Sequence, residues 1–238
     1  MKQGWRARGY LVDLDGTLIS DNKPLPGARR MLDAFGGQFA LVSNDAEHTP
    51  AELARLLLQI GLPIDPGRIV LAGACTLDII AQERRASRVM LLGSPALREY
   101  GRGLGLNMTM LEPDIVVIAR DRAFNYDKLS FAANLVRDGA QLIVTNPDTT
   151  HPGRAGSVVP ETGALLAAVL SCAGAVSYRI IGKPEPALFE RALTRLGVSP
   201  SEAVMIGDNP HTDGAGAGRL GIRYLNVETM QRLVLSGD

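Results

Sequence analysis

The chain has 238 residues and carries 25 basic and 25 acidic side chains, so its formal net charge is zero. This balance excludes the basic surface that general nucleic-acid-binding proteins present. Hydrophobic residues make up 46% of the sequence, which is ordinary for a globular protein of one or two domains. The two cysteines match no metal-binding or redox spacing and therefore indicate reduced thiols in a cytoplasmic protein.

Neither a targeting segment nor a membrane span is predicted. Residues 1–10 are basic, but no apolar region of a signal peptide follows them. The most apolar stretch, residues 163–178, is shorter than the roughly 20 residues that cross a bilayer. We interpret it as a buried helix rich in small residues, and we expect a soluble protein without a membrane partner.

Short apolar runs alternate with helical periodicity along the chain, which predicts an α/β fold with a mainly parallel sheet flanked by helices. The predicted strands are, in chain order, residues 9–14, 38–43, 88–92, 114–119, 141–145, 178–181 and 203–206. A capping pattern at residues 49–52 begins one predicted helix, and Gly61 ends it. A second predicted helix begins at Pro186 and ends before Gly197.

Two of the predicted strands end in pairs of carboxylates. The string LVDLDGTL carries Asp13 and Asp15, and the string AVMIGDNPHTD carries Asp208 and Asp213. The carboxyl ends of parallel strands form the edge where open α/β sheets bind ligands. Carboxylates that meet there need a shared cation or proton, and an oxygen-only site suits Mg²⁺. Taken alone, each string is also consistent with an ordinary turn.

Two further strands end in residues that suit a phosphoryl group. The string RIIGKPEP carries Lys183, one of only four lysines, and its ammonium can neutralise a phosphate or the acidic residues as a point charge. The string LVSND carries Ser43 and Asn44, whose hydroxyl and amide can donate to phosphoryl oxygens. A solvated lysine and a polar turn are the alternatives.

In chain order, these four strings resemble the four signature motifs of the haloacid dehalogenase (HAD) superfamily. The resemblance implies a Rossmannoid core and a phosphatase in which Asp13 is the nucleophile and forms an aspartyl-phosphate with the help of Mg²⁺. It also implies that Asp15 is the general acid and base, and this second Asp favours phosphoryl transfer over dehalogenation. The implied phosphate-binding residues are Gly16, Ser43, Asn44 and Lys183, and the implied metal ligands are Asp13, Asp15, Asp208 and Asp213.

Loop lengths predict where a cap domain is inserted. Residues 18–26 are too few to form a domain, whereas residues 45–182 leave room for one of about 100 residues. We therefore expect a smaller α/β cap that closes over the site and excludes water. The expected core is residues 1–72 and 179–238, and the expected cap is residues 73–178.

Within the predicted cap, the string TNPD resembles the type-IIA cap of the para-nitrophenyl phosphatase-like, or NagD-type, branch. The resemblance implies that Asn146 and Asp148 contact the substrate, and a turn after a strand is the alternative. The string VPETGA resembles the Pro-Gly-x-Gly-Ala stretch of that branch, but Glu161 replaces the first Gly. Asp45 likewise stands where the branch often has a neutral residue. These two departures leave the catalytic motifs intact, and they affect which substrate contacts are expected in the cap.

Two other features are interpreted as structural. Residues 216–221, GAGRLG, fit a dinucleotide-binding fingerprint, but the chain after them is too short for a full βαβ unit, so we expect close helix packing. His48, His151 and His211 show no metal-ligand spacing.

The sequence thus favours a Mg²⁺-dependent phosphatase that acts on a small phosphorylated metabolite. A phosphomutase or phosphotransferase that uses the same aspartyl-phosphate is one alternative, and a non-catalytic small-molecule-binding relative is another. The sequence leaves a homo-oligomer open without indicating one.

Overall fold

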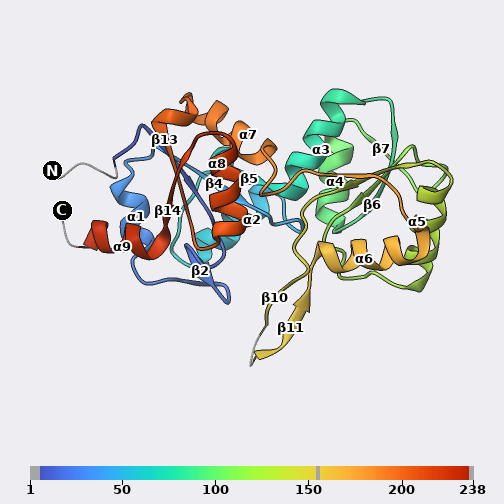
Figure 1. Cartoon of the computed structure of the whole chain (residues 1–238), viewed down its shortest axis with the longest axis horizontal. Coiled ribbons are helices and arrows are strands. Elements are labelled where there is room, and N and C mark those ends of the chain that lie inside the picture. Colours follow the sequence, from blue (N-terminus) through green and yellow to red (C-terminus); the bar gives the residue numbers. More distant parts are fainter. Residues whose placement is uncertain (1–5, 154–155, 236–238) are drawn as a thin grey trace. The chain divides into compact units, whose positions relative to one another are not determined.

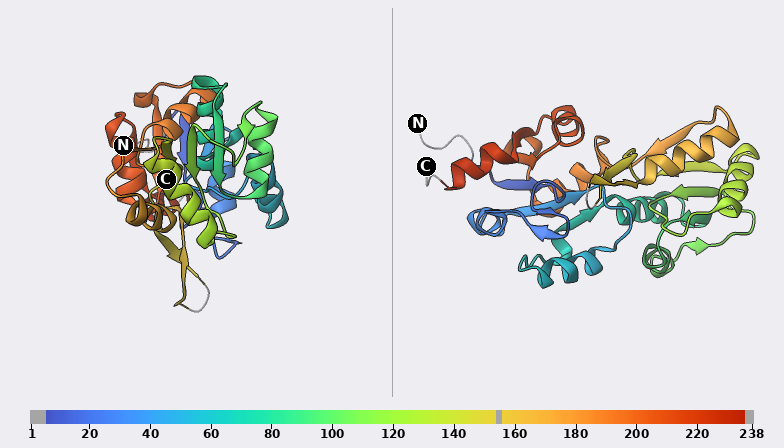
Figure 2. Two further views of the ribbon diagram at one scale, coloured as in Figure 1. Left: turned by 90° about the vertical axis from the view of Figure 1, so that its right-hand side faces the viewer. Right: turned by 90° about the horizontal axis from the view of Figure 1, so that it is seen from below.

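The structure is a computed structural model that describes residues 6–153 and 156–235 (Figure 1, Figure 2). Residues 1–5 of the predicted core lie outside the described residues. The chain separates into two compact units, and each contains a five-stranded sheet. The first unit consists of Met1–Ser43, Pro50–Val70 and Lys183–Asp238, and the second consists of Asn44–Thr49 and Leu71–Gly182.

The first sheet is formed by β1 (Gly9–Val12), β4 (Phe39–Ser43), β5 (Ile69–Leu71), β13 (Ala203–Gly207) and β14 (Arg223–Asn226). Its strand order is β14-β13-β1-β4-β5, and β1 pairs in parallel with both β4 and β13. Every residue of β1, β4 and β13 is buried, as is typical of parallel strands that are covered by helices. The ends of β1, β4 and β13 therefore lie next to one another at one edge of the sheet.

Helices and one short hairpin surround this sheet. They are β2 (Ile19–Ser20), β3 (Lys23–Pro24), α1 (Ala28–Ala34), α2 (Pro50–Gln59), α7 (Ala187–Leu196), α8 (Ala215–Arg219) and α9 (Val227–Leu235). α7 buries one apolar stripe against β1 and β4, and Gly197 ends it in the left-handed conformation, with φ of 66°. The two helices predicted from the sequence, α2 and α7, are confirmed.

The second sheet is formed by β6 (Arg88–Leu92), β7 (Asn107–Met108), β8 (Ile115–Ile118), β9 (Gln141–Val144) and β12 (Tyr178–Ile180). Its strand order is β12-β9-β8-β6-β7, and all of its pairs are parallel. The remaining elements are α3 (Ala72–Glu83), α4 (Pro95–Gly103), α5 (Tyr126–Arg137), α6 (Thr162–Ala173) and the antiparallel hairpin of β10 (Thr150–Pro152) and β11 (Val158–Pro160).

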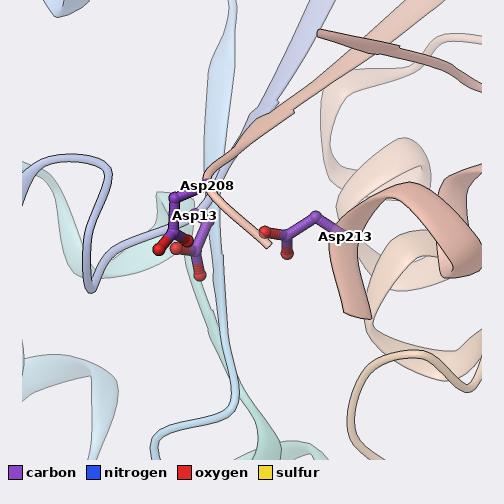
Figure 3. Close-up of side chains that lie close together, drawn as sticks. All are labelled: Asp13, Asp208 and Asp213. Atoms are coloured by element: carbon purple, nitrogen blue, oxygen red, sulfur yellow. The ribbon is translucent and has the colours of Figure 1, made fainter. Parts of the chain in front are cut away.

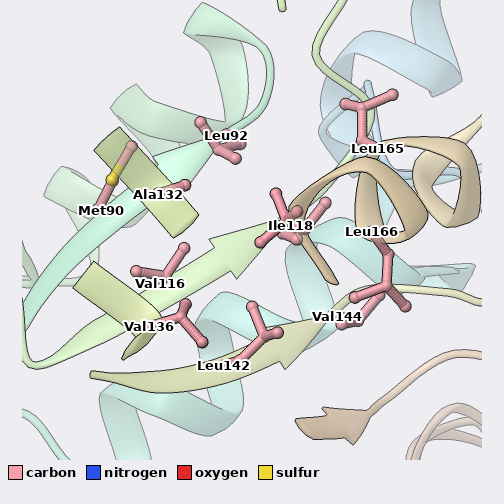
Figure 4. Packing of buried hydrophobic residues seen from close by; sticks show 11 residues of the cluster. Met90, Leu92, Val116, Ile118, Ala132, Val136, Leu142, Val144, Leu165 and Leu166 are labelled. Atoms are coloured by element: carbon pink, nitrogen blue, oxygen red, sulfur yellow. The ribbon is translucent and has the colours of Figure 1, made fainter. Parts of the chain in front are cut away.

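α5 and α6 form a hydrophobic core with the second sheet. Ala132 and Val136 of α5, and Leu165 and Leu166 of α6, pack over the aliphatic side chains of β6, β8 and β9 (Figure 4). Because this unit has a sheet and an apolar core of its own, it has the organisation of an α/β cap domain. The predicted fold class, a Rossmannoid core with an inserted α/β cap, is confirmed.

Two segments belong to a different unit from the one expected. β12 was expected in the core, but it pairs with β9 and so lies in the second sheet. The segment Asn44–Thr49 also belongs to the second unit, because its carbonyls accept hydrogen bonds from that unit. The N–H of Gly73 donates to the carbonyl of Asp45 at 3.1 Å, and the N–H of Arg120 donates to that of Ala46 at 3.2 Å.

The apolar stretch at residues 163–178 is only partly a helix. α6 ends at Ala173, where Gly174 adopts a φ of 84°, and one side of α6 is exposed. Among the described residues, no helix combines the length and the apolar character that crossing a bilayer requires. The close packing predicted for the glycines of residues 216–221 is confirmed at Gly216, where an added Cβ would overlap the ring of Phe189. It is wrong for Gly218 and Gly221, where an added Cβ meets nothing within 4 Å.

Candidate active site

Three carboxylates lie close together at the edge of the first sheet. Asp13 directly follows β1, Asp208 directly follows β13, and Asp213 belongs to the helical turn Pro210–Gly214 that comes next. One oxygen of each carboxylate lies within 4.8 Å of the others (Figure 3). Asp13 and Asp213 are buried, whereas Asp208 is exposed. The two carboxylate-bearing strand ends predicted from the sequence therefore do meet.

The ammonium of Lys183 lies against two of these carboxylates. Its Nζ donates to Asp13 Oδ1 at 2.6 Å, to Asp213 Oδ1 at 2.7 Å and to the carbonyl of Val42 at 3.0 Å. Lys183 is only 2% exposed, so these contacts compensate for its desolvation. Three carboxylates and one ammonium leave two net negative charges, which a divalent cation can balance.

Burial shifts the pKa values of the ionisable groups in the site. Burial raises the pKa of Asp213 to about 7, although the ammonium of Lys183 acts in the opposite direction. Burial and, secondly, the charge of Asp13 raise the pKa of Asp208. Burial disfavours the charged form of Lys183, but the charges of Asp13 and Asp213 outweigh this effect, and its pKa lies above the ordinary value. Carboxylates that repel one another in this way attract a cation.

The second oxygens of the two buried carboxylates are also held in place. Asp13 Oδ2 accepts a hydrogen bond from Thr17 Oγ1 at 3.1 Å, and Asp213 Oδ2 accepts one from the N–H of Asn209 at 3.3 Å. Thr17 is fully buried and was not among the site residues predicted from the sequence. The signal that identifies it is its position four residues after Asp13, in the turn that follows the same strand.

The donors fit a small divalent cation. All three side chains offer hard carboxylate oxygens, which Mg²⁺ and Ca²⁺ prefer over nitrogen or sulfur. Gly16, with φ of 75°, lies directly against Asp208, and an added Cβ would overlap that carboxylate. A glycine at this position thus keeps open the space beside the Asp208 oxygens. Among the described residues, no other group of three such side chains is found, and the histidines join none.

Replacing Gly16 with Ala is expected to lower Mg²⁺ affinity about 10- to 100-fold, because the new methyl group must displace the carboxylate of Asp208. Isothermal titration with Mg²⁺ measures this change. Gly27→Ala is the matched control: Gly27 also has a positive φ, of 83°, but an added Cβ there meets nothing within 4 Å. Equal Mg²⁺ affinities for the two variants would contradict the role assigned to Gly16.

Ser43 and Asp15, also predicted for the core site, lie at the carboxyl ends of the neighbouring strands β4 and β1. Ser43 is buried at the last position of β4, the strand that neighbours β1. Asp15 is exposed in the turn after β1 and forms an isolated β-bridge with Ile19. Asp15 thus lies at the surface of the first unit, two residues after Asp13.

Asn44, Asn146 and Asp148 form a hydrogen-bonded group in the second unit. Asn44 Nδ2 donates to Asp148 Oδ2 at 3.0 Å, and Asn146 Nδ2 donates to the carbonyl of Asn44 at 2.8 Å. Asn146 Oδ1 accepts from the N–H of Asp148 at 3.0 Å. Gly182 packs directly beside this group and has no room for a side chain, because an added Cβ would lie 2.5 Å from the carbonyl oxygen of Thr145. These side chains thus fix the chain immediately after Ser43 and immediately before Lys183.

Two family models match ranges that together include most of the first unit and part of the second. A model described as haloacid dehalogenase-like hydrolase matches residues 10–107, and a second, described as HAD-hydrolase-like, matches residues 180–231. These two ranges include all three carboxylates of the cluster as well as Ser43 and Lys183.

The curated proteins and the solved structure that resemble this chain are named as phosphatases. Dihydroxyacetone phosphatase of Corynebacterium glutamicum is 33% identical over 207 residues, which are 86% of this chain and 74% of that protein. Acid sugar phosphatase of Staphylococcus aureus is 33% identical over 226 residues, which are 93% of this chain and 86% of that protein. The crystal structure of 4-nitrophenylphosphatase from Thermotoga maritima matches with a TM-score of 0.87 and 27% identity, covering 92% of this chain and 85% of that one.

The similarities to known phosphatases agree with the geometry of the site, in which strand-end carboxylates lie beside a buried lysine. The chain belongs to the haloacid dehalogenase-like hydrolase family and is a phosphoric monoester hydrolase of its para-nitrophenyl phosphatase-like, NagD-type branch.

Proposed function

We propose that this protein is a Mg²⁺-dependent phosphatase that hydrolyses small sugar phosphates through an aspartyl-phosphate on Asp13. The supporting observation is the contact of Lys183 with both Asp13 and Asp213, beside the exposed carboxylate of Asp208. Two relatives, named dihydroxyacetone phosphatase and acid sugar phosphatase, support this substrate class. Cys172, an exposed free thiol, supports a reducing, cytoplasmic location.

The proposed reaction has two displacements at phosphorus. First, a carboxylate oxygen of Asp13 bonds to phosphorus while the ester P–O bond breaks, and Asp15 gives its proton to the leaving alkoxide. Asp15 then takes a proton from water, the water oxygen bonds to phosphorus, and the bond to Asp13 breaks. Inorganic phosphate leaves, and both side chains return to their initial states.

Electrostatics explain why the other residues are needed. A carboxylate and a phosphate monoester repel each other, so the attack needs positive charge that is already in place. Lys183 supplies one such charge, and Ser43, with Gly16 and Asn44, is proposed to donate to phosphoryl oxygens. Mg²⁺, when bound by Asp13, Asp208, Asp213 and the carbonyl of Asp15, would supply the remaining charge between nucleophile and phosphate.

We also propose that the two domains have separate roles, one as the catalytic core and the other as the cap. Met1–Ser43, Pro50–Val70 and Lys183–Asp238 would form the catalytic core, and Asn44–Thr49 and Leu71–Gly182 would form the cap. Asn146 and Asp148 would contribute to the substrate side of the cap.

A phosphate-release assay with dihydroxyacetone phosphate and 4-nitrophenyl phosphate tests this function. We expect free inorganic phosphate from both, complete loss of turnover after treatment with EDTA, and recovery on addition of Mg²⁺. Turnover that survives exhaustive chelation, or a phosphoryl group that is moved to another carbon without release of phosphate, would contradict the proposal.

The affinity for Mg²⁺ is expected to rise with pH. The pKa values of Asp208 and Asp213 are raised, to about 7 for Asp213, so protons compete with the cation at lower pH. Between pH 8 and pH 5.5 the dissociation constant should increase about 10-fold or more. Isothermal titration at a series of pH values measures it, and a constant affinity over this range would contradict the assignment of these ligands.

A further inference from the structure

A tyrosine that the proposed mechanism does not use contacts the strand end that carries Asp208. Tyr224 belongs to β14, which pairs in parallel with β13. Its backbone is paired with Met205, and its hydroxyl reaches further along β13 and donates to the carbonyl of Gly207 at 3.1 Å. Because Gly207 directly precedes Asp208, this hydrogen bond holds the backbone from which a proposed metal ligand projects.

Gly207 is also in direct contact with the second proposed ligand of this segment. An added Cβ at Gly207 would overlap the carboxylate of Asp213, so only a glycine leaves room for that buried side chain. A shift of the Gly207 backbone therefore disturbs Asp213 as well as Asp208. The carbonyl that Tyr224 binds thus belongs to the residue on which the positions of both carboxylates depend.

The ring of Tyr224 contacts the other end of the same segment. The helical turn Pro210–Gly214 contains Asp213, and an added Cβ at Gly214 would lie 3.3 Å from Cδ1 of the ring. The ring therefore packs against the backbone directly after Asp213, while the hydroxyl binds the backbone directly before Asp208. A single side chain thus holds both ends of residues 207–214.

Asn226 fixes the direction of the Tyr224 hydroxyl. The carbonyl of Gly207 can only accept, so the single hydroxyl proton of Tyr224 is used there. The side chain of Asn226 also forms a hydrogen bond with this hydroxyl, and it must therefore donate through its amide nitrogen. Its Oδ1 accepts the N–H of Glu228 at 3.0 Å, which anchors Asn226 to the start of α9.

The space beside Asp208 is open. Asp208 is exposed and lines a cavity of about 420 Å³ together with Gly16, Asn226 and Val227. Close packing, which fixes side chains in a protein interior, is therefore missing on this side of Asp208. The position of its carboxylate depends instead on the backbone that carries it, and Tyr224 holds that backbone.

We propose that Tyr224 is a positioning residue for the cation site, because it holds both ends of the segment that carries Asp208 and Asp213 at the spacing that binds Mg²⁺. This inference rests on the proposed function, which assigns these carboxylates to the metal. Groups that orient metal ligands typically contribute about 10- to 100-fold to metal affinity. The effect of Tyr224 is therefore expected in the binding of the cation itself.

Tyr224→Phe tests this role, because it keeps the ring against Gly214 and removes only the hydroxyl. Isothermal titration should show that the dissociation constant for Mg²⁺ increases about 10-fold relative to the wild-type protein. The Mg²⁺ concentration that gives half-maximal phosphate release from 4-nitrophenyl phosphate should rise by a similar factor.

Tyr10→Phe is the matched control. The hydroxyl of Tyr10, a residue near the amino end of β1 in the same unit, accepts a hydrogen bond from the N–H of Ala7 at 3.0 Å. Both variants thus lose one bond between a hydroxyl and the backbone, and their urea unfolding midpoints should fall by similar amounts. Only Tyr224→Phe should change the Mg²⁺ affinity, whereas Tyr10→Phe should stay within about twofold of wild type.

Asn226→Ala is a second variant, which leaves Tyr224 in place without its orienting partner. It should weaken Mg²⁺ binding about threefold, the effect of one modest hydrogen bond. The double variant should bind Mg²⁺ no more weakly than Tyr224→Phe, because Asn226 acts through the hydroxyl that phenylalanine lacks. Circular dichroism checks that all variants fold.

The outcomes separate this inference from the proposed function. If the wild-type protein binds Mg²⁺ and releases phosphate, equal Mg²⁺ affinities of Tyr224→Phe and Tyr10→Phe overturn the positioning role alone. Additive losses in the double variant overturn the part assigned to Asn226. A wild-type protein that neither binds Mg²⁺ nor releases phosphate overturns the proposed function and the positioning role together.

Discussion

Replacing Asp13 with Asn is expected to lower kcat for 4-nitrophenyl phosphate at least about 1,000-fold, because the amide can neither attack phosphorus nor balance a cation. The fold should persist, since Lys183 keeps its contacts with Asp213 and with the carbonyl of Val42. Steady-state release of 4-nitrophenol at saturating Mg²⁺ measures the loss.

Asp33→Asn is the matched control for this experiment. Asp33 is an exposed aspartate of α1 in the same unit, paired with Arg29 at 3.0 Å. Its replacement should leave kcat within about twofold of wild type, because exposed ion pairs contribute little. Retention of more than about a tenth of the activity by Asp13→Asn would show that another group is the nucleophile.

Replacing Lys183 with Met is expected to lower the free energy of unfolding by about 3–5 kcal/mol, because it leaves Asp13 and Asp213 buried without their cationic partner. The loss should be larger at pH 8 than at pH 6. Without the ammonium, protonated carboxyl groups suit the buried site better, and the native state gains those protons only as the pH falls. Urea unfolding at the two pH values measures both effects.

Lys23→Met is the matched control, since Lys23 is an exposed residue of β3 in the same unit. It should change stability by less than about 0.5 kcal/mol. Added Mg²⁺ should restore part of the stability of Lys183→Met, because a bound cation neutralises the same carboxylates. A loss below about 1 kcal/mol at pH 8 would contradict the central electrostatic role of Lys183.

Much of the core could be predicted from the sequence because local signals and topology agree there. β1, β4 and β13 are short, mainly apolar and fully buried. β4 ends in Ser43, and β1 and β13 are directly followed by Asp13 and Asp208. Parallel strands of one sheet end at the same edge, and the resemblance to the four motifs of the haloacid dehalogenase superfamily implied that these strands share a sheet. The convergence of Asp13 and Asp208 could therefore be predicted.

The location of Lys183 could not be predicted in the same way. The apolar run before it reads as a core strand, but β12 pairs with β9 of the second unit. Hydrophobic periodicity identifies a strand but not the sheet it joins. Lys183 is positioned instead by the chain's entry into the first unit after Gly182, whose missing side chain leaves room for Thr145 and Asn44.

The charged network of the second unit, in which Arg120 lies against Glu47 and Glu161, was only partly visible in the sequence. Asp45 and Glu161 could be recognised as departures from the resembled pattern, but they are distant in the sequence and share no periodicity with Arg120. Their association depends on the carboxyl end of β8 and on the anchoring of the segment Asn44–Thr49, which are tertiary features.

Trapping the covalent intermediate tests the account most directly. In an Asp15→Asn variant, loss of the general base should slow hydrolysis, whereas 4-nitrophenolate can leave without a proton from residue 15. A rapidly quenched reaction with 4-nitrophenyl phosphate and Mg²⁺ should therefore leave phosphate attached to the protein. Peptide mapping by mass spectrometry should locate this phosphate on Asp13, and removal of Mg²⁺ should prevent its formation. Phosphate on a different residue, or rapid turnover with no labelled peptide at any time, would contradict nucleophilic attack by Asp13.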